Sequence, residues 1–287
     1  MMKKRLEILN SLTLKIIACL LMTLDHVALF FVNPVTNYDL YYGLRATGKI
    51  SFPIFVFLAF YGAYKTKDIR KYLLRLLIPG VLIDLCGYIL SWSLEIPIAE
   101  NPIIGNAFID LFLGVLLVSL LKKKNYYSFL AVLPLLYSFF STFPINNEYG
   151  TLFKTDWGFF GTCLFLAFFL AKEIVHLFIR QKAAQDGILL ETYEEENGFF
   201  LEKIALSVAL LFVDLVFYLI YRLDNSSFVL PTEFVPIGTY VALAFPFFLL
   251  SSQRKGYGSK ILQYSFYVHY PLHLLVLFAI STALSLL

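Results

Sequence analysis

The first long apolar segment of the chain carries two ionisable side chains in its interior. Residues 12–32 read LTLKIIACLLMTLDHVALFFV, with Asp25 and His26 inside the segment. A run of this length can cross a bilayer as one helix. An ionisable group within a bilayer costs free energy, so it is by default a candidate for function. The segment therefore predicts a membrane protein with a polar site inside the membrane.

The composition predicts a membrane protein along the whole length of the chain. Hydrophobic residues make up 59% of the 287 residues and charged residues only 15%, whereas about a quarter of the residues of a soluble domain are charged. No stretch of soluble-domain length separates the apolar segments. We therefore expect one integral membrane domain over residues 1–287. The cysteines at 19, 86 and 163 lie within apolar segments, as small buried side chains do.

The apolar segments predict an all-α fold, a polytopic transmembrane helical bundle of about nine spans. The expected spans are 12–32, 45–64, 72–92, 105–121, 126–143, 157–179, 199–221, 235–252 and 261–286. Two of them, 105–121 and 126–143, are shorter than the roughly 20 residues that a span needs. A tilted or re-entrant helix is the alternative for these two segments.

Lysine and arginine are distributed unevenly between the two sides of the predicted bundle. With the N-terminus in the cytoplasm, 15 basic residues beside the spans lie on the inner side, and Lys154 and Arg222 remain outside. This asymmetry follows the positive-inside rule, so we expect a cytoplasmic N-terminus. The polar segment at about 180–198 is then expected to be a cytoplasmic loop. Because the basic residues follow the topology, they indicate no nucleic-acid-binding surface.

Polar side chains within or beside the spans converge on the outer half of the bundle. The set comprises Asp25, His26, Arg45, Lys49, Asp84, Asp110, Asp156, Asp214, His269 and His273. A neutral imidazole such as His26 can accept a proton from an attacking amine or hydroxyl, and a carboxylate on its other nitrogen would fix the tautomer. Neighbouring residues of a helix point about 100° apart. Asp156 or Asp110, from another helix, is therefore the expected partner of His26.

Arg45 and Lys49 are four residues apart and so share one helix face. Two cations there can stabilise an oxyanion or hold an anionic group. The alternative is that these charges pair with carboxylates and only hold the bundle together. The structural interpretation is favoured for Asp84 and Asp214 taken alone.

His269 and His273 have the i, i+4 spacing of two metal ligands on a helix. Pro271 lies between them, and the segment VHYPLHLL holds no third ligand. We therefore expect no metal, and interpret this segment as an aromatic wall of a pocket with one functional histidine. His273 is favoured over His269 for that role.

Five elements, in this order, resemble the TraX family of bacterial membrane proteins, whose namesake acetylates the N-terminal residue of conjugative pilin. They are LKIIACLLMTLDHVALFF, LRATGKISFPIFVFLAFYGAYKTKDIRKYLLRLL, NAFIDLFLG, TDWGFFG and FYVHYPLHLLVL. The resemblance covers about residues 12–180 and 260–280. Its most specific parts are the Asp-His pair of the first span and the Tyr-Pro-x-His sequence near the end.

The resemblance implies roles for particular residues. Asp25 and His26 match the Asp-His pair of the family, and His273 matches its terminal histidine. Arg45 matches the arginine before the glycine-basic-x-x-phenylalanine-proline run, and Asp156 and Gly158 match the acidic-aromatic-glycine turn.

The chain also departs from the family. Lys49 stands where the family often has arginine, and Asp110 stands where the family has threonine.

From the resemblance we expect a multi-pass acyltransferase of the bacterial cytoplasmic membrane. It would move an acyl group from acyl-CoA, with acetyl-CoA as donor substrate, to an amine or hydroxyl at the outer side; the acceptor would be a pilin-like peptide, a glycan or a lipid. His26 would act as general base or transient acyl carrier, and Asp25 would support the charge or geometry of the site. His273 would line the opposite wall.

The same interpretation gives the remaining polar residues a binding role. Arg45 and Lys49 would stabilise the oxyanion or hold the phosphates of the donor. Asp156 and Asp110 would contribute to substrate binding.

Two other classes of protein remain open at this point. A transporter or lipid-handling protein would use the same polar cluster for substrate or proton binding, although the two halves of the chain show no inverted repeat. A protein that serves as an assembly partner would carry only structural charges.

Overall fold

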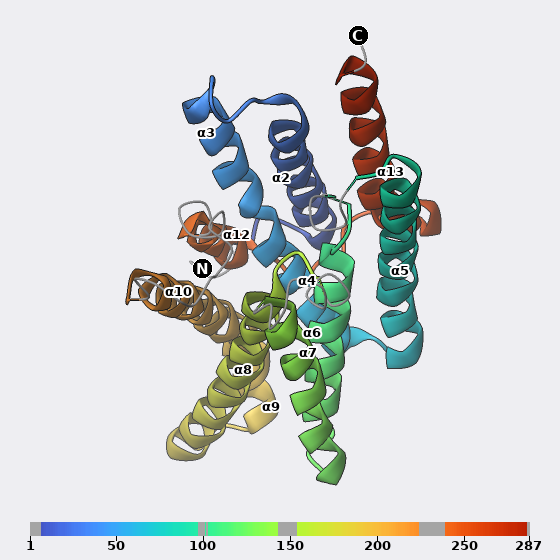
Figure 1. Cartoon of the computed structure of the whole chain (residues 1–287). Helices are drawn as coiled ribbons and strands as arrows, with labels where there is room; N and C mark the ends of the chain where they lie inside the picture. Colours follow the sequence, from blue (N-terminus) through green and yellow to red (C-terminus); the bar gives the residue numbers. More distant parts are fainter. Residues whose placement is uncertain (1–6, 97–100, 102, 143–153, 224–238, 286–287) are drawn as a thin grey trace.

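The computed structural model describes residues 7–96, 101, 103–142, 154–223 and 239–285 (Figure 1). The helices in this part of the chain are α2 (Ser11–Phe31), α3 (Tyr38–Lys49), α4 (Ser51–Lys65), α5 (Ile69–Ser93), α6 (Ala107–Leu121), η2 (Tyr126–Ala131), α7 (Val132–Thr142), α8 (Gly158–Asp186), α9 (Leu190–Tyr193), η3 (Glu194–Gly198), α10 (Phe199–Leu223), η4 (Thr239–Ala244), α12 (Phe245–Leu250) and α13 (Lys260–Ser285). Within the described residues the only β-type pairing is a bridge between Leu9 and Ser251. The predicted all-α helical bundle is therefore confirmed.

Each of the nine predicted spans corresponds to helix in the described part of the chain. Six helical stretches are long and apolar enough to cross a membrane: Ser11–Phe31, Tyr38–Lys65, Ile69–Ser93, Gly158–Asp186, Leu190–Ile220 and Ile261–Leu284. Three shorter apolar stretches, Ala107–Leu121, Tyr126–Thr142 and Tyr240–Leu250, occupy the other predicted positions. Residues 235–238 of the eighth predicted span lie outside the described residues. The chain is thus a multi-pass membrane protein.

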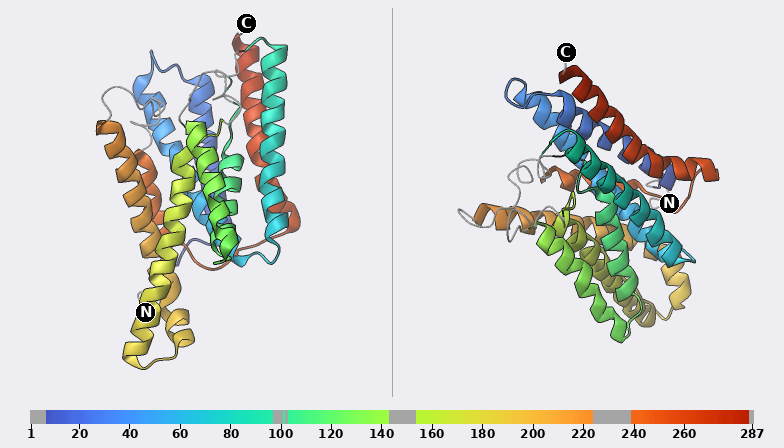
Figure 2. Two further views of the ribbon diagram at one scale, coloured as in Figure 1. Left: turned by 60° about the horizontal axis from the view of Figure 1, so that its bottom comes forward. Right: turned by 45° about the vertical axis from the view of Figure 1, so that its right-hand side comes forward.

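The segment at 180–198 differs from the prediction, because most of it is helical. Helix α8 continues to Asp186 and ends at Gly187, whose φ of +66° is a left-handed conformation that terminates helices. Helix begins again at Leu190. The loop was predicted from the polarity of this segment, but charged residues are also compatible with an exposed helix. Polarity alone therefore does not distinguish a loop from a helix here. In the left view of Figure 2 the resulting hairpin extends beyond the other helices.

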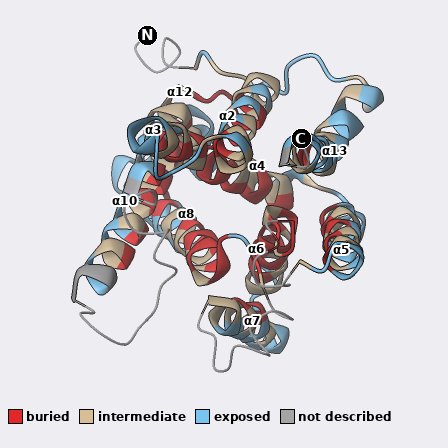
Figure 3. Ribbon diagram, turned by 45° about the horizontal axis from the view of Figure 1, so that its top comes forward, coloured by how far each residue is buried: buried red, intermediate tan, exposed pale blue. Residues whose placement is uncertain are grey.

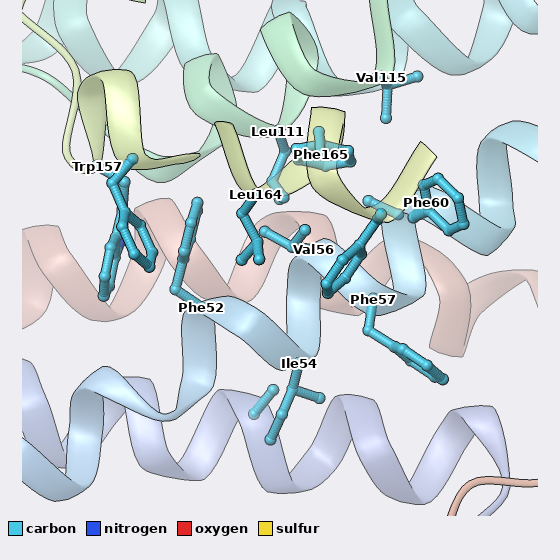
Figure 4. Packing of buried hydrophobic residues seen from close by; sticks show 14 of the residues in the cluster. Phe52, Ile54, Val56, Phe57, Phe60, Leu111, Val115, Trp157, Leu164 and Phe165 are labelled. Atoms are coloured by element: carbon cyan, nitrogen blue, oxygen red, sulfur yellow. The ribbon is translucent and has the colours of Figure 1, made fainter. Parts of the chain in front are cut away.

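Helices α4, α6 and α8 form the centre of the bundle, and α5 and α13 lie at its periphery (Figure 3). The central contact is made by large side chains that are almost fully buried, among them Phe52 and Phe60 of α4, Leu117 of α6, and Phe165 and Phe168 of α8. Figure 4 shows part of this cluster, in which aromatic rings from α4 interdigitate with side chains from α6 and α8. This core holds the helices that surround the polar site.

Basic residues of separate elements meet at one end of the bundle. Lys15 near the start of α2, Lys65 at the end of α4, Arg75 in α5 and Lys255 before α13 all line one cavity. We call this end of the bundle the basic end. The positive-inside rule predicts that it faces the cytoplasm.

Candidate functional site

Asp25 and His26 are neighbours on α2 but face different helices. Asp25 faces α3, where Arg45 Nη1 donates to Asp25 Oδ2 at 2.9 Å and Lys49 Nζ lies 3.5 Å from the same oxygen. His26 faces α13, where its Nδ1 lies 2.8 Å from His273 Nε2. The step of about 100° between neighbouring helical residues separates the two side chains. Helix α2 therefore carries an ion-pair cluster on one side and a histidine pair on the other.

The hydrogen-bond partners of His273 assign the protons on both imidazoles. His273 Nδ1 lies 2.7 Å from the carbonyl oxygen of His269. A carbonyl only accepts, so His273 carries a proton on Nδ1. In neutral His273, Nε2 is then an acceptor, and His26 donates to it from Nδ1. The unprotonated nitrogen of neutral His26 is therefore Nε2, which can accept a proton from a substrate.

A second polar contact joins α2 and α13 one turn nearer the basic end. The Thr23 hydroxyl donates to the carbonyl oxygen of Cys19 at 2.9 Å and lies 3.1 Å from His269 Nε2, which donates to it. The imidazoles of His269 and His273 stack with centroids 4.9 Å apart and an interplanar angle of 15°. The two histidines thus bond to different residues of α2. Among the described residues, no group of three His, Cys, Asp or Glu side chains is arranged to hold a metal ion.

Tyr270 packs against the histidine pair and was not selected from the sequence. Its ring meets the rings of His26 and His273 edge-on, with centroids 6.0 Å and 5.7 Å away. Its hydroxyl lies 3.4 Å from the backbone nitrogen of Ala107, at the start of α6. Tyr270 is buried and so fixes the pair relative to α6. The available signal was its place in the Tyr-Pro-x-His sequence.

The ion-pair cluster depends on a close approach of α2 and α3. A Cβ atom on Gly48 would lie 2.3 Å from Asp25 Cβ, so only glycine allows this separation. Asp25 and Arg45 are 7% and 6% exposed, and Asp25 Oδ1 has no hydrogen-bond partner among the described residues. Arg45 and Lys49 also lie within electrostatic range of His26. The two sides of α2 therefore form one connected polar site.

Asp110 organises the turn that precedes α8. It is fully buried on α6, and its Oδ2 accepts hydrogen bonds from the backbone N–H groups of Asp156 and Trp157, each at 3.0 Å. The Asp156 side chain is exposed and lies within electrostatic range of Lys49. Asp110 thus has a structural contact, whereas Asp156 lies at the edge of the ion-pair cluster.

The prediction that Asp156 or Asp110 orients His26 is wrong. His273 occupies that position, because α13 packs against the His26 face of α2, whereas Asp110 bonds to the backbone of the turn before α8. The partner of His26 is therefore a neutral imidazole.

Trp157 links this turn to the cations. Its ring stacks on Phe52 with centroids 4.2 Å apart and an interplanar angle of 6°, and Lys49 Nζ lies 5.1 Å from the ring centroid. A cation at this distance over an indole ring is attracted to it. Trp157 therefore helps to hold Lys49 beside Asp25, a role that sequence reasoning did not assign.

Asp84 and Asp214 lie apart from this site. Asp84 Oδ1 accepts from Asn106 Nδ2 at 2.9 Å and from the backbone N–H of Gly105 at 3.0 Å. These bonds attach the segment before α6 to α5 and support the structural interpretation of Asp84. Asp214 is half-buried on α10, and the part of the chain described here shows no partner for it.

A cavity of about 530 Å³ extends from the basic end toward the histidine pair. Its inner end is lined by Met22 and Tyr270. Met22 lies one helical turn before His26 on the same face of α2, and Tyr270 contacts the rings of His26 and His273. The volume is within the range of about 300–1,000 Å³ that ligand pockets occupy. The cavity therefore gives access from the basic end to the surroundings of His26.

Comparison with known proteins identifies one family. Residues 11–170, more than half of the chain, match the family model described as TraX protein. No curated protein and no solved structure matches the chain. The matched region contains Asp25, His26, Arg45, Lys49, Asp110 and Asp156 and ends before His269 and His273.

Proposed function

Because the chain belongs to the TraX family, we propose that it is a membrane-bound acyltransferase that uses acetyl-CoA as donor. The acceptor is an amine or hydroxyl at the end of the bundle opposite the basic end, and the membrane is the bacterial cytoplasmic membrane. One observation carries this proposal beyond the family match. His26 has an unprotonated Nε2 and lies just beyond the inner end of a cavity that starts at the basic end.

In this proposal His26 acts as general base. The acceptor nitrogen or oxygen attacks the thioester carbonyl carbon while His26 Nε2 takes its proton. A C–N or C–O bond forms, the C–S bond breaks, and coenzyme A leaves as a thiolate. The thiolate takes the proton from the His26 imidazolium, which restores the neutral base and gives the free thiol.

His273 stabilises the protonated state of His26. The imidazolium of His26 donates from Nδ1 to His273 Nε2, 2.8 Å away, and the proton can shift along this bond. His273 then carries the charge, with its own Nδ1–H directed at the carbonyl oxygen of His269. The positive charge is thus distributed over two rings. This arrangement replaces the carboxylate that orients the histidine in a catalytic triad.

The ion-pair cluster supplies positive charge near the reacting atoms. Arg45 and Lys49 together carry one more charge than Asp25 can neutralise, and both lie within electrostatic range of His26. Negative charge develops on the carbonyl oxygen during attack, and preorganised cations stabilise it. In this proposal Asp25 holds the two cations in place and does not take part in proton transfer.

Transfer of labelled acetyl from acetyl-CoA tests the proposal. We would reconstitute the purified protein in phosphatidylcholine vesicles and offer three probe acceptors: a peptide with a free N-terminus, an N-acetylglucosamine oligomer and phosphatidylethanolamine. We expect labelled product with at least one acceptor, and its loss in His26→Gln. His176→Gln is the matched control, because His176 is exposed on α8 and outside the site.

Two results would contradict the proposal. One is acetyl transfer by His26→Gln at the rate of the unmodified protein. The other is uptake of a labelled acceptor into the vesicles that occurs without acetyl-CoA and requires His26, because a transporter would behave in this way.

A further inference from the structure

Four basic side chains from separate elements line the cavity at the basic end. They are Lys15 of α2, Lys65 of α4, Arg75 of α5 and Lys255 of the 251–259 loop. The described residues that line this cavity include no aspartate or glutamate. None of the four basic residues forms an ion pair within the described part of the chain. The cavity lining itself therefore offers these charges no carboxylate, and Glu202, which attracts Lys65, lies outside that lining.

Membrane topology alone does not explain this arrangement. The positive-inside rule places basic residues at this end of the bundle but does not direct them at a cavity. Lys71, at the same end and outside the cavity, pairs with Asp68 at 3.2 Å. Lys65 instead lies within electrostatic range of two cations, Lys255 and Lys172, and of one carboxylate, Glu202. A bound anion would relieve the repulsion between Lys65 and Lys255.

Ser252 provides a second, independent indication of a ligand. The residue is 5% exposed, and its hydroxyl has no hydrogen-bond partner among the described residues. It lines the same cavity as the four cations. A buried hydroxyl without a partner lowers stability, and an oxygen atom of a bound ligand would accept its hydrogen bond.

The loop that carries Ser252 and Lys255 is held in place by other parts of the chain. The backbone N–H of Ser252 donates to the carbonyl oxygen of Leu9 at 2.7 Å. Lys203, which is fully buried on α10, donates from Nζ to the carbonyl oxygen of Ser251 at 2.9 Å. A loop that is ordered before binding loses less entropy when a ligand binds. These contacts therefore favour a preformed binding site.

We propose that five side chains form one phosphate-binding site, the basic mouth: Lys15, Lys65, Arg75, Ser252 and Lys255. The assignment rests on the proposed acyltransferase function. The pyrophosphate and 3′-phosphate of coenzyme A bind at the basic mouth, and the uncharged pantetheine arm extends along the cavity toward Tyr270. The length of the cavity along α2 follows from Ser11 and Met22, which both line it. The helix rises about 16 Å between these two residues, and this is the distance along which the pantetheine arm would extend. The headgroup of an anionic lipid offers the same phosphate chemistry, so the experiment must separate the two sources.

Binding measurements on the whole protein test this site without relying on activity. In phosphatidylcholine nanodiscs, we would measure the dissociation constants of coenzyme A, 3′-dephospho-coenzyme A and pantetheine by calorimetry. We expect affinity to fall in that order. Lys255→Gln and Arg75→Gln should each weaken coenzyme A binding about tenfold, since each loses a charge-assisted contact, and leave pantetheine binding unchanged. Lys71→Gln is the matched control and should change the affinity for neither coenzyme A nor pantetheine.

Ser252→Ala gives a second readout that does not require catalysis. The variant removes a buried hydroxyl without a partner, so its unfolding midpoint without ligand should equal or exceed that of the unmodified protein. The rise in midpoint on adding coenzyme A should be smaller than in the unmodified protein. An unchanged rise would count against the basic mouth.

The outcomes separate this inference from the proposed function. Unchanged coenzyme A affinity in Lys255→Gln and Arg75→Gln overturns the basic mouth, even if acetyl transfer is observed. Weakened affinity in these variants, with His26→Gln binding normally, supports it even if no acetyl is transferred. A third outcome is that phosphatidylglycerol raises the unfolding midpoint, that coenzyme A does not, and that the rise is absent in Lys255→Gln. This outcome overturns the nucleotide assignment and identifies a lipid headgroup as the ligand.

Discussion

His26 donates from Nδ1 to Nε2 of His273 across 2.8 Å, so the candidate base is oriented by a neutral imidazole. The Asp25 carboxylate lies on the other side of α2, where it binds two cations. A neutral partner suits a site within the membrane, because an additional buried carboxylate would need its own compensation. The proton that His26 accepts can be shared with His273 without creating a second charge.

Replacement of either histidine by glutamine should reduce acetyl transfer. We expect His26→Gln to lower kcat by about 10²–10⁴-fold, the usual contribution of a general base. His273→Gln should lower kcat less than His26→Gln does. The glutamine carbonyl can still accept a hydrogen bond from His26 Nδ1, although it cannot take the proton. The double variant should be no slower than His26→Gln, since the two rings act as a unit. Losses that multiply in the double variant would show that the residues act independently.

Asp25→Asn should reduce stability because it leaves the buried Arg45 and the partly buried Lys49 without their shared anion. Removing one partner of a buried ion pair costs about 3–5 kcal/mol, which we would measure by unfolding in detergent. Asp68→Asn is the matched control. Asp68 is exposed and pairs with Lys71, and asparagine keeps its capping bond to the Lys71 backbone N–H, so little change is expected. Equal effects of the two substitutions would indicate that the buried pair has no special role.

Hydropathy was sufficient to locate the helices but not their partners. In a membrane every backbone polar group must be hydrogen-bonded within the protein, and a single apolar run of about 20 residues meets this requirement as a helix. The hairpin at 180–198 was missed because its charged residues are compatible with an exposed helix, and Gly187 alone marks the end of α8. Charge was a reliable guide for Arg45 and Lys49, whose pairing with a carboxylate was among the alternatives and is made with Asp25.

Helix packing decided the features of the site that the sequence did not reveal. The partner of His26 depends on which helix lies against that face of α2, and no local pattern specifies this. The cavity likewise depends on the packing of α2, α4, α5 and α13, and its lining residues are far apart in the sequence. Ser252 and Lys255 became candidates only when the fold placed their loop beside α2.

Gly48→Ala should disrupt the contact between α2 and α3. The added Cβ would lie 2.3 Å from Asp25 Cβ, so the helices must separate and the bond between Arg45 and Asp25 must lengthen. Overpacking of this kind costs about 1–3 kcal/mol, and unfolding in detergent would measure it. Gly43→Ala is the matched control on the same helix, since a Cβ there meets nothing within 4 Å. Stability unchanged in both variants would contradict the observed approach of the helices.

Substitutions at Asp110 distinguish a structural role from substrate binding. Asp110→Asn keeps a side-chain oxygen for the N–H groups of Asp156 and Trp157, so we expect near-normal stability and KM. Asp110→Ala leaves both N–H groups without their acceptor, and should cost about 1–3 kcal/mol for each of them. If Asp110 instead binds a substrate, Asp110→Asn should raise KM while the unfolding midpoint stays constant.

Met22→Ala should change the acyl groups that the protein accepts. Met22 and Tyr270 line the inner end of the cavity, where the thioester of the donor would lie in the proposed orientation. A shorter side chain makes room for further methylene groups, and one methylene in an apolar pocket changes kcat/KM by about 10–200-fold. We therefore expect the ratio of kcat/KM for butyryl-CoA over acetyl-CoA to rise at least tenfold in this variant. Cys19→Ala, a buried change on α2 outside the cavity lining, should leave the ratio unchanged. An unchanged ratio in Met22→Ala would mean that the acyl group lies elsewhere, because a donor in the proposed orientation cannot avoid this side chain.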